Sequence, residues 1–587
     1  MSLKKHKIIV GVDLGTTYSG QYDFIKNVND IDLIRNWPGK GKASDEVSKT
    51  PSRIAFANEN PHYDSDRWGY EVLPKMVACS WFKLGLDKNV EVTDFDDPEL
   101  HTLAESEGNG MFRLPANMSP ADVCAAYLTP FYRHVMDHLE KRFSAEILAT
   151  MPIEFWFTVP AIWSDKAKAD TKAAAMKAGF ASRLEDAIKM IPEPEAAAVA
   201  ALKSLAEGSS GDSQLKPKMG IMIIDCGGGT VDLTSYKITG ISPKLEFEEL
   251  VPGIGGKCGS TSIDRGFHAW MERVFREHFT NIPFEKKGPG SALMKEFELI
   301  KRDFGSSRDR NQEYELTLVM PGVEEGRYYD DSECVVKLYQ SDMLGFFQRP
   351  LDRITRMIQQ QLDQAKETSP DCPITLAILV GGFGDSSHIN RELKEWCRSA
   401  GDIRLICPEK PQAAIVRGAA FRGLEGIKPS SRRCRRAYGF EVCLPFRKDI
   451  DPKKDGYKCL WTGRRMCCRR LDWQILKVDD TTKISSSVYE ISEGDFPSSS
   501  ELSLYSCDVD LLPERTTDPW TKRIGTIKLN FKDIDPKLLK RKTMYGKKLN
   551  KLDCQVEVLL GKEEGVLCFR VMCGHREIGS TEITYEN

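Results

Sequence analysis

The chain has 587 residues, of which 41% are hydrophobic and 29% are charged, and this composition excludes a disordered or collagen-like protein. Its 83 basic and 86 acidic residues give a net charge of −3, which argues against a general nucleic-acid or membrane-surface binder but leaves room for a local basic patch. No apolar run approaches the ~18–20 residues of a membrane-spanning helix. The seventeen cysteines follow neither a disulfide framework nor zinc-site spacing, so we expect reduced thiols in a cytoplasmic protein, with the nucleus as a second compartment.

Apolar runs predict four strands in the first 425 residues. The first run, Lys7–Val12, is too short for the core of a secretory signal, and Asp13 follows it at once. The other three are Phe155–Val159, Gly220–Ile224 and Ile374–Val380. Continuous apolar runs of this length are typical of strands that are buried on both faces of an α/β sheet.

Helices are predicted between these strands. Capping residues begin them at Ser119-Pro120, at Ser164-Asp165 and at Ser341-Asp342, and the third helix has apolar residues three and four positions apart on one face. The polar segments Glu207–Lys218 and Asn281–Gly290 are predicted to be loops.

Two junctions resemble each other. Asp13-x-Gly-Thr and Asp225-x-Gly-Gly-Gly-Thr-Val-Asp232 each follow an apolar strand and lead into a second strand, whereas the glycine turn of a dinucleotide fold leads into a helix. Glycines let backbone N–H groups approach phosphate oxygens, and carboxylates suit a hard divalent ion. One such motif could be an ordinary tight turn, but the pair suggests two similar lobes that face one phosphate ligand.

The composition and the hydrophobic pattern of the sequence change after Ile427. An arginine-rich segment, residues 428–437, has the composition of a linker, and short β-type runs follow it to the end of the chain. We therefore predict a two-lobed domain over residues 1–427, with its second lobe from about residue 215, and a β-rich domain over residues 438–587 built as a sandwich or barrel. The predicted strands are Tyr438–Leu444, Trp473–Val478, Leu502–Cys507, Gly525–Phe531, Gln555–Leu560, Gly565–Met572 and Gly579–Tyr585.

Four ordered segments within residues 6–425 resemble the heat-shock protein 70 family. They are similar to its first phosphate loop, hinge helix, second phosphate loop and adenosine loop, and they lie at Val10–Ser19, Ile191–Ala200, Ile224–Asp232 and Leu379–Asp385. The resemblance implies the α/β, two-lobed actin-like ATPase fold around a central site for ATP or ADP and Mg2+.

The resemblance also implies roles for individual residues. Asp13, Lys83, Glu193 and Asp225 match the catalytic groups, and Asp13 and Asp225 also match the carboxylates that hold magnesium. A solvated lysine explains Lys83 nearly as well. On spacing alone, Glu298, Lys301 and Arg302 could instead form an exposed charged helix face. The nucleotide contacts implied are Gly15, Thr16, Thr17, Tyr18, Gly227, Gly228, Gly229, Thr230, Gly255, Gly256, Glu298, Lys301, Arg302, Gly381, Gly382, Gly384 and Asp385.

Several departures bear on function. Gly255-Gly-Lys-Cys-Gly-Ser-Thr261 stands where the family has two glycines followed by acidic residues, and it would place Lys257 and Cys258 near the predicted phosphates. Its Gly-Ser-Thr part resembles the divergent member-twelve branch of the family and related fungal sequences. Gly305 and Gln412 stand where the family has a serine and an acidic residue. The leucine-rich interdomain linker, the helical lid and the acidic tail that recruits helical-repeat cochaperones have no counterpart, so we expect no conventional peptide clamp.

Three functions fit these features. The first is an ATP-binding, weakly hydrolysing switch that controls partner or client binding through lobe closure. The second is a non-hydrolysing, nucleotide-dependent scaffold or sensor, and the last is a sugar-kinase relative. We expect no nucleic-acid partner, and we expect the β-rich domain to act as a protein-docking surface. Its arginine clusters, at residues 432–436 and 464–470, would either be solvated or hold anionic partners.

Overall fold

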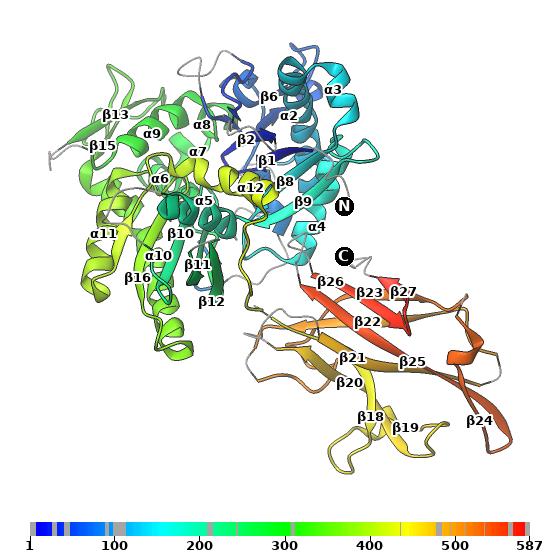
Figure 1. The fold of residues 1–587 in the computed structure, drawn as a ribbon. Helices are drawn as coiled ribbons and strands as arrows, with labels where there is room; N and C mark the ends of the chain where they lie inside the picture. The colour runs from blue at the N-terminus through cyan, green and yellow to red at the C-terminus, as the bar shows by residue number, and fades with distance from the viewer. Residues whose placement is uncertain are drawn as a thin grey trace. The chain divides into compact units, whose positions relative to one another are not determined.

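The structure is a computed structural model, and the chain forms two compact units, unit 1 (Met1–Ser430) and unit 2 (Ser431–Asn587) (Figure 1). Among the residues that it describes, no helix is both long and apolar enough to cross a membrane, and the cysteines are free thiols. The described residues are 7–25, 32–39, 47–87, 93–97, 113–207, 215–241, 245–306, 312–434, 436–476, 484–493, 495–509, 511–532, 534–560 and 567–580.

Lobe I of unit 1 is built on a mixed sheet with the strand order β3-β2-β1-β8-β9, to which β4 is added beside β2. β1 pairs antiparallel with β2 and parallel with β8, and every residue of β1 is buried. The strands are β1 (Ile8–Asp13), β2 (Tyr18–Ile25), β3 (Asp32–Leu33), β4 (Lys49–Pro51), β8 (Ile153–Val159) and β9 (Ala187–Pro192).

Lobe II repeats this plan with the strand order β12-β11-β10-β16-β17. β10 pairs antiparallel with β11 and parallel with β16, as β1 does with β2 and β8, so both predicted strand–turn–strand junctions are present. The strands are β10 (Gly220–Cys226), β11 (Val231–Gly240), β12 (Glu246–Gly256), β16 (Ile374–Val380) and β17 (Arg404–Ile406).

Helices α5 and α12 join the two lobes. α12 packs on β1, α5 packs on β10, and the two helices pack against each other. A Cβ atom on Gly418 would lie 1.6 Å from the carbonyl oxygen of Ala196, so the close crossing requires glycine at that position. The helices of unit 1 are α2 (Pro120–Phe143), α3 (Ala145–Thr150), α4 (Asp165–Lys177), α5 (Glu193–Glu207), α6 (Thr261–Phe275), α7 (Glu277–Thr280), α8 (Phe284–Lys287), α9 (Ala292–Asp303), α10 (Gln340–Thr368), α11 (Ser387–Gly401) and α12 (Ala414–Glu425).

Two small sheets complete the lobes. One has the order β6-β5-β7 and the other β13-β15-β14. A 3-10 helix, Phe82–Asp87, follows the first of them and carries Lys83. The strands are β5 (Arg53–Ala55), β6 (Arg67–Trp68), β7 (Cys79–Ser80), β13 (Glu313–Thr317), β14 (Tyr329–Asp330) and β15 (Val335–Tyr339).

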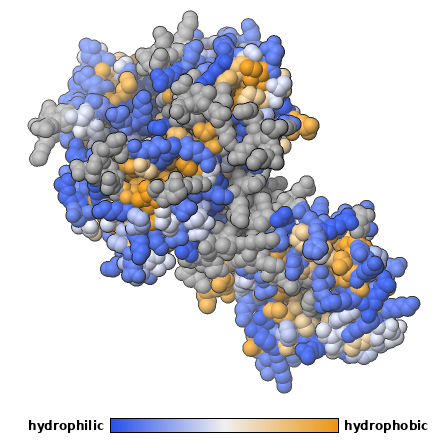
Figure 2. Space-filling view, in the orientation of Figure 1, coloured by the Kyte–Doolittle hydropathy of each residue, from blue (hydrophilic) through white to orange (hydrophobic). Residues whose placement is uncertain are grey.

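Unit 2 consists of two antiparallel sheets with the orders β19-β20-β18-β22-β23 and β21-β25-β26-β27, and β24 pairs with β25. Phe440, Leu504, Ile527 and Val556 belong to one buried core that draws on both sheets, as in a β-sandwich. The strands are β18 (Ala437–Pro445), β19 (Gly456–Lys458), β20 (Arg465–Ile475), β21 (Ile484–Glu493), β22 (Ser499–Cys507), β23 (Lys522–Asn530), β24 (Lys540–Met544), β25 (Lys547–Leu560), β26 (Leu567–Cys573) and β27 (Arg576–Ser580). On the visible face of both units, hydrophobic patches are separated by hydrophilic residues (Figure 2).

Some predicted boundaries were wrong. The predicted loop Asn281–Gly290 contains the short helix α8, and the buried Lys287 at the end of this helix donates to the carbonyl oxygen of Thr280, the last residue of α7, at 2.6 Å. The strand predicted over Trp473–Val478 ends at Ile475 and begins at Arg465, within a polar run that lacks clear alternation. The strands β19, β21 and β24 were not predicted, because their sequences also lack a clear alternation of apolar and polar residues. Most of the other predicted loop, residues 208–214, lies outside the described residues.

Candidate functional site

A cavity of about 780 Å³ lies between the two lobes of unit 1. Its walls come from the turn after β1, the turn after β10, the 3-10 helix Phe82–Asp87, and the first residues of α5. Helix α9 and the turn after β16 close the remaining side. The predicted site residues that line the cavity are Asp13, Gly15, Thr16, Thr17, Tyr18, Lys83, Glu193, Asp225, Gly227, Gly228, Gly229, Thr230, Glu298, Lys301, Arg302, Gly381, Gly382 and Asp385.

The two turns approach each other closely across the cavity. A Cβ atom on Gly228 would lie 2.4 Å from Thr17 Oγ1, and one on Gly229 would lie 2.4 Å from Thr16 Oγ1. Glycine at both positions therefore permits this approach of the lobes, with backbone N–H groups and threonine hydroxyls beside the cavity. Such a cradle suits phosphate oxygens.

Asp13 already has a counter-charge inside the chain. Lys49, at the start of β4, donates from Nζ to Asp13 Oδ2 at 2.6 Å, and Thr158 donates from Oγ1 to Asp13 Oδ1 at 3.0 Å. Burial alone would raise the pKa of Asp13, but Lys49 and Lys83 outweigh it and hold that pKa below its usual value. The sequence analysis missed Lys49, because nothing in the surrounding Ser48-Lys-Thr-Pro51 indicates that β4 lies beside β2.

Asp225 has the opposite environment. Its side chain is only 2% exposed, and its Oδ1 atom has no hydrogen-bond partner among the described residues. Burial raises the pKa of Asp225 well above its usual value, and the neighbouring acids Glu193, Asp232 and Asp13 raise it further. An unsatisfied buried carboxylate among other acids is stabilised by a hard divalent cation, so this residue fits the magnesium site that the sequence predicts.

Lys83 and Glu193 form a buried ion pair at the cavity wall. The distance from Lys83 Nζ to Glu193 Oε1 is 2.7 Å, and the lysine ammonium also lies 5.3 Å from the centre of the Trp163 ring. Burial raises the pKa of Glu193 to about 7 although Lys83 opposes that shift. The solvated alternative for Lys83 is therefore wrong in this structure, because its side chain is buried and paired.

Helix α9 supplies a second charged group to the cavity. Glu298 pairs with Lys301 at 2.6 Å and with Arg302 at 2.8 Å, and Lys301 also pairs with Asp264 at 2.7 Å. Burial opposes the charge on Lys301, but the two acids raise its pKa above the usual value. The Arg302 guanidinium lies 5.3 Å from the centre of the Tyr18 ring, so a cation of lobe II contacts an aromatic ring of lobe I.

Three predicted contacts do not line the cavity: Gly255, Gly256 and Gly384. Lys257 and Cys258 do not line it either, since Lys257 donates to the carbonyl oxygen of Asp87 at 2.6 Å and Cys258 is buried in the lobe II core. Both were expected near the phosphates. Gln412 does line the cavity, and its Nε2 atom donates to Asp385 Oδ2 at 2.9 Å.

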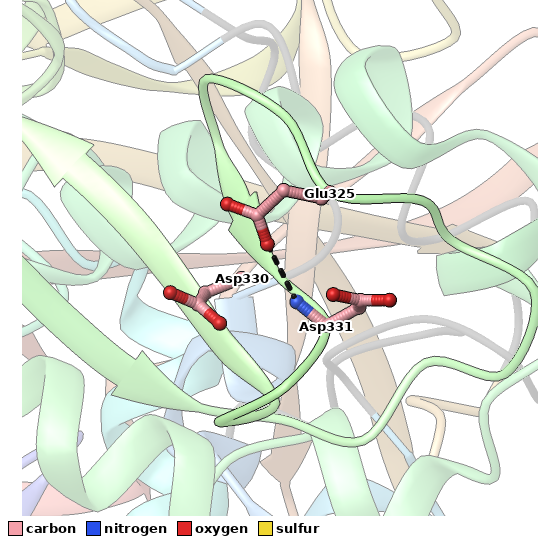
Figure 3. A group of neighbouring side chains, drawn as sticks. All are labelled: Glu325, Asp330 and Asp331. Carbon is pink, nitrogen blue, oxygen red and sulfur yellow. Dashed lines mark hydrogen bonds between the residues drawn. The ribbon is translucent and has the colours of Figure 1, made fainter.

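A separate acidic group lies on β14 and the loops beside it (Figure 3). Glu325, Asp330 and Asp331 have carboxylate oxygens within 4.8 Å of one another, but none of them lines the cavity. Lys337 lies 3.2 Å from Asp330 and 3.9 Å from Glu325, and Glu325 accepts from the backbone N–H of Asp331. Because Lys337 pairs with two of these acids and exposed acidic groups are common without a metal, we assign the cluster no metal.

The sequence has recognisable relatives although no protein-family model matches it. It is 25% identical to the human heat shock 70 kDa protein 12A, over 89% of this chain and 85% of that protein. It is 24% identical to the human heat shock 70 kDa protein 12B, over 90% of this chain and 84% of that protein. The chaperone protein DnaK of Mycoplasmopsis agalactiae is 23% identical over 71% of this chain and 58% of DnaK, a shorter match than those of the 12A and 12B proteins.

Two similar α/β lobes that enclose a cavity between paired glycine loops have the architecture of the actin-like ATPase fold. Unit 2 adds a β-rich region to this fold. Over most of its length the chain is similar to the heat shock 70 kDa proteins 12A and 12B.

Proposed function

We propose that the protein is an ATP-dependent molecular switch that hydrolyses ATP slowly. The observation that carries this proposal is the buried Lys83–Glu193 pair, which lies in the same cavity as Asp13 and Asp225. Phosphoryl transfer to water depends on positioning and on neutralising charge, and this set supplies a cation, a nearby acid and two carboxylates for magnesium. The predicted nucleotide contacts on both lobes would then be made together only when the lobes are closed.

Each group of cavity residues has a separate role in the proposed hydrolysis of ATP. In the proposed complex the paired turns around Thr17 and Gly228 hold the phosphates, and Lys83 stabilises charge on the terminal phosphate. Glu193 orients the attacking water by accepting a hydrogen bond from it. Magnesium, when bound, would neutralise the phosphate oxygens, with Asp13 and Asp225 as its carboxylates. Helix α9 would contact the nucleoside through Glu298, Lys301 and Arg302.

Single-turnover hydrolysis with Glu193→Gln tests this assignment. We expect a rate at least about 100-fold lower than that of the unchanged protein, because an amide replaces the group that orients water. ADP affinity, measured by calorimetry, should change by less than about threefold, since Glu193 acts at the terminal phosphate. An unchanged rate would remove Glu193 from the mechanism, and absence of ADP binding to the unchanged protein would overturn the nucleotide site.

A non-hydrolysing scaffold is the second candidate. It would follow if the Lys83–Glu193 ion pair persists when nucleotide binds, because a paired glutamate is less available to orient water than a free one. Undetectable single-turnover hydrolysis together with ADP binding would support the scaffold. In both cases we propose that unit 2 docks protein partners and does not clamp extended apolar peptides.

A titration with a fluorescent apolar heptapeptide, with and without ATP, tests this proposal for unit 2. Binding of the peptide together with faster release in the presence of ATP would contradict it.

A further inference from the structure

Two hairpin turns of unit 2 lie against each other, and neither is explained by the nucleotide site. One joins β19 to β20 and the other joins β24 to β25 (Figure 1). A Cβ atom on Gly463 would lie 3.1 Å from Tyr545 Oη, and Lys542 donates from Nζ to the carbonyl oxygen of Trp461. We call residues 457–465 and 540–548 together the double-hairpin tip.

The double-hairpin tip exposes large apolar side chains. Tyr545 is 63% exposed, Tyr457 is 42% exposed and Leu460 is 39% exposed. Tyr545 has φ of 52° and Gly546 has φ of 73°, the pair of positive values of a two-residue hairpin turn. Such turns favour Asn-Gly, and tyrosine is strained at the first position. Turn geometry therefore does not account for an exposed aromatic residue at this place.

Basic residues surround these apolar side chains. The two segments of the tip contain eight lysines and arginines and no acidic residue. Lys540 pairs with Asp553 and Lys547 pairs with Glu493, each through an exposed contact. In the described part of the chain, no ion pair engages the other six, which are Lys458, Arg464, Arg465, Arg541, Lys542 and Lys548.

The neighbouring arginines of the same sequence cluster have internal roles. Buried Arg470 pairs with Asp451 at 3.2 Å, and Arg469 lies 3.7 Å from Asp455. Within residues 464–470, Arg469 and Arg470 therefore form ion pairs, whereas Arg464 and Arg465 on the tip form none with described residues, although Arg465 lies 3.9 Å from the centre of the Phe446 ring. Two unpaired lysines also lie over aromatic rings, since Lys458 is 4.7 Å from the Tyr545 ring centre and Lys542 is 4.8 Å from that of Trp461.

We propose that the double-hairpin tip docks onto anionic membrane surfaces. An interfacial anchor combines exposed aromatic and aliphatic residues, which enter the boundary between headgroups and acyl chains, with lysines and arginines that reach the lipid phosphates. Both components are present here on adjacent hairpin turns. An acidic peptide would match the charges but would leave the exposed apolar side chains in contact with water. The bases of a single-stranded nucleic acid could stack on Tyr545, but they would not cover Leu460 as acyl chains would.

Vesicle sedimentation of the full-length chain tests the proposal. We expect binding to vesicles of phosphatidylcholine with roughly a third phosphatidylserine and little binding to phosphatidylcholine alone. Each basic residue near such a surface strengthens binding by about fivefold, so the triple variant Arg464→Glu/Arg541→Glu/Lys548→Glu should bind at least about 100-fold more weakly. Raising the salt concentration should weaken the binding of the unchanged protein.

Two matched control variants show whether a loss of binding comes from the tip or from any equal change of charge or exposed apolar surface in unit 2. Lys528→Glu/Lys532→Glu/Lys537→Glu makes the same change of net charge at exposed positions of unit 2 outside the tip. Leu460→Ser/Tyr545→Ser removes the apolar part of the tip, and Leu511→Ser/Trp520→Ser removes side chains that are 89% and 55% exposed elsewhere. We expect each tip variant to lose binding and each control to keep it, with thermal unfolding temperatures unchanged throughout.

Three outcomes would overturn the proposal. The first is equal binding to vesicles with and without phosphatidylserine, and the second is an equal loss in tip and control variants. The third is stronger binding to polyglutamate or to a single-stranded oligonucleotide than to the anionic vesicles at the same salt concentration. If the tip variants unfold, the unchanged protein still decides the question through its lipid preference and its competition with polyglutamate.

Discussion

The turns after β1 and β10 share one backbone plan but differ in electrostatics. Each joins a buried strand to an antiparallel strand, and an aspartate is the last residue of the first strand (Asp13) or the one before it (Asp225). Asp13 in the first turn is paired with Lys49 and bonded to Thr158, and its pKa is lowered. Asp225 in the second turn has an unpartnered oxygen, and its pKa is raised.

This difference indicates how the two lobes divide the site. In lobe I, the buried carboxylate of Asp13 is neutralised by Lys49 of the same lobe. The charge on this side of the cavity is therefore compensated before a ligand binds. Lobe II leaves a buried acid uncompensated, which costs stability in the free protein and is relieved when a cation binds. Two similar turns can therefore differ in charge, and we expect that a metal ion bound in this cavity would be held mainly by lobe II.

The largest expected effect comes from breaking the lobe I pair. Lys49→Met should lower the free energy of unfolding by about 3–5 kcal/mol, because it leaves the Asp13 carboxylate buried without its nearest cation. Urea-induced unfolding at neutral pH measures this. The matched control is Lys7→Met, which breaks a 2.6 Å pair with Glu154 whose side chains are 31% and 21% exposed. That change should cost less than about 1 kcal/mol, and equal losses would contradict the comparison.

The buried histidine His268 gives a second test of how much a buried charge costs in lobe II, because acid would add a proton to it. His268 on α6 packs against Phe279, and burial lowers its pKa from 6.5 to about 4. Between these two values the unfolded chain binds a proton that the folded chain does not. Stability is therefore complete above about pH 6.5 and falls as the pH drops toward 4, by about 3 kcal/mol in all. His268→Phe should remove this share of the acid sensitivity in urea unfolding measured from pH 7 to 4, and an unchanged slope would disprove it.

Neutralising the lobe II aspartate should separate metal binding from stability. Asp225→Asn should weaken the magnesium-dependent part of ADP binding by about 100-fold, measured by calorimetry with and without magnesium. The same change should raise the stability of the free protein, because it removes an uncompensated buried charge. Asp13→Asn should instead lower that stability, since it leaves Lys49 unpaired. If both variants shift stability in the same direction, the proposed division between lobes is wrong.

Much of the fold could be predicted because its signals are local. The antiparallel strand pairs follow from apolar runs that end at aspartate and glycine, and the capped start of α2 follows from Ser119 and Asp122. β20 was misplaced because its ladder pairing, and not an alternating pattern, holds its polar residues in a strand. The resemblance to a known family supplied the α9 residues, which spacing alone could not distinguish from an exposed face.

The parts of the site that the sequence did not predict depend on contacts between distant segments. Lys49 meets Asp13 only because β4 pairs with β2, and 36 positions separate the two residues. Lys257 was expected in the cavity, but its Nζ atom bonds to Asp87, 170 positions away. Long-range pairings of this kind leave no pattern in the neighbouring residues, so charge placement was harder to predict than the backbone that carries it.

The smallest expected effect concerns the approach of the two turns. In Gly228→Ala the new Cβ would lie 2.4 Å from Thr17 Oγ1 and 2.9 Å from its Cγ2 atom, so the lobes must separate slightly. We expect ADP affinity to fall by about tenfold, or about 1.4 kcal/mol. Adding Thr17→Ala removes both clashing atoms and leaves Thr17 Cβ at 3.2 Å, so the double variant should bind ADP about as well as Thr17→Ala alone. Calorimetry on the four proteins gives the coupling between the two positions. Additive losses would mean that Gly228 acts on the ligand and not on the distance between lobes.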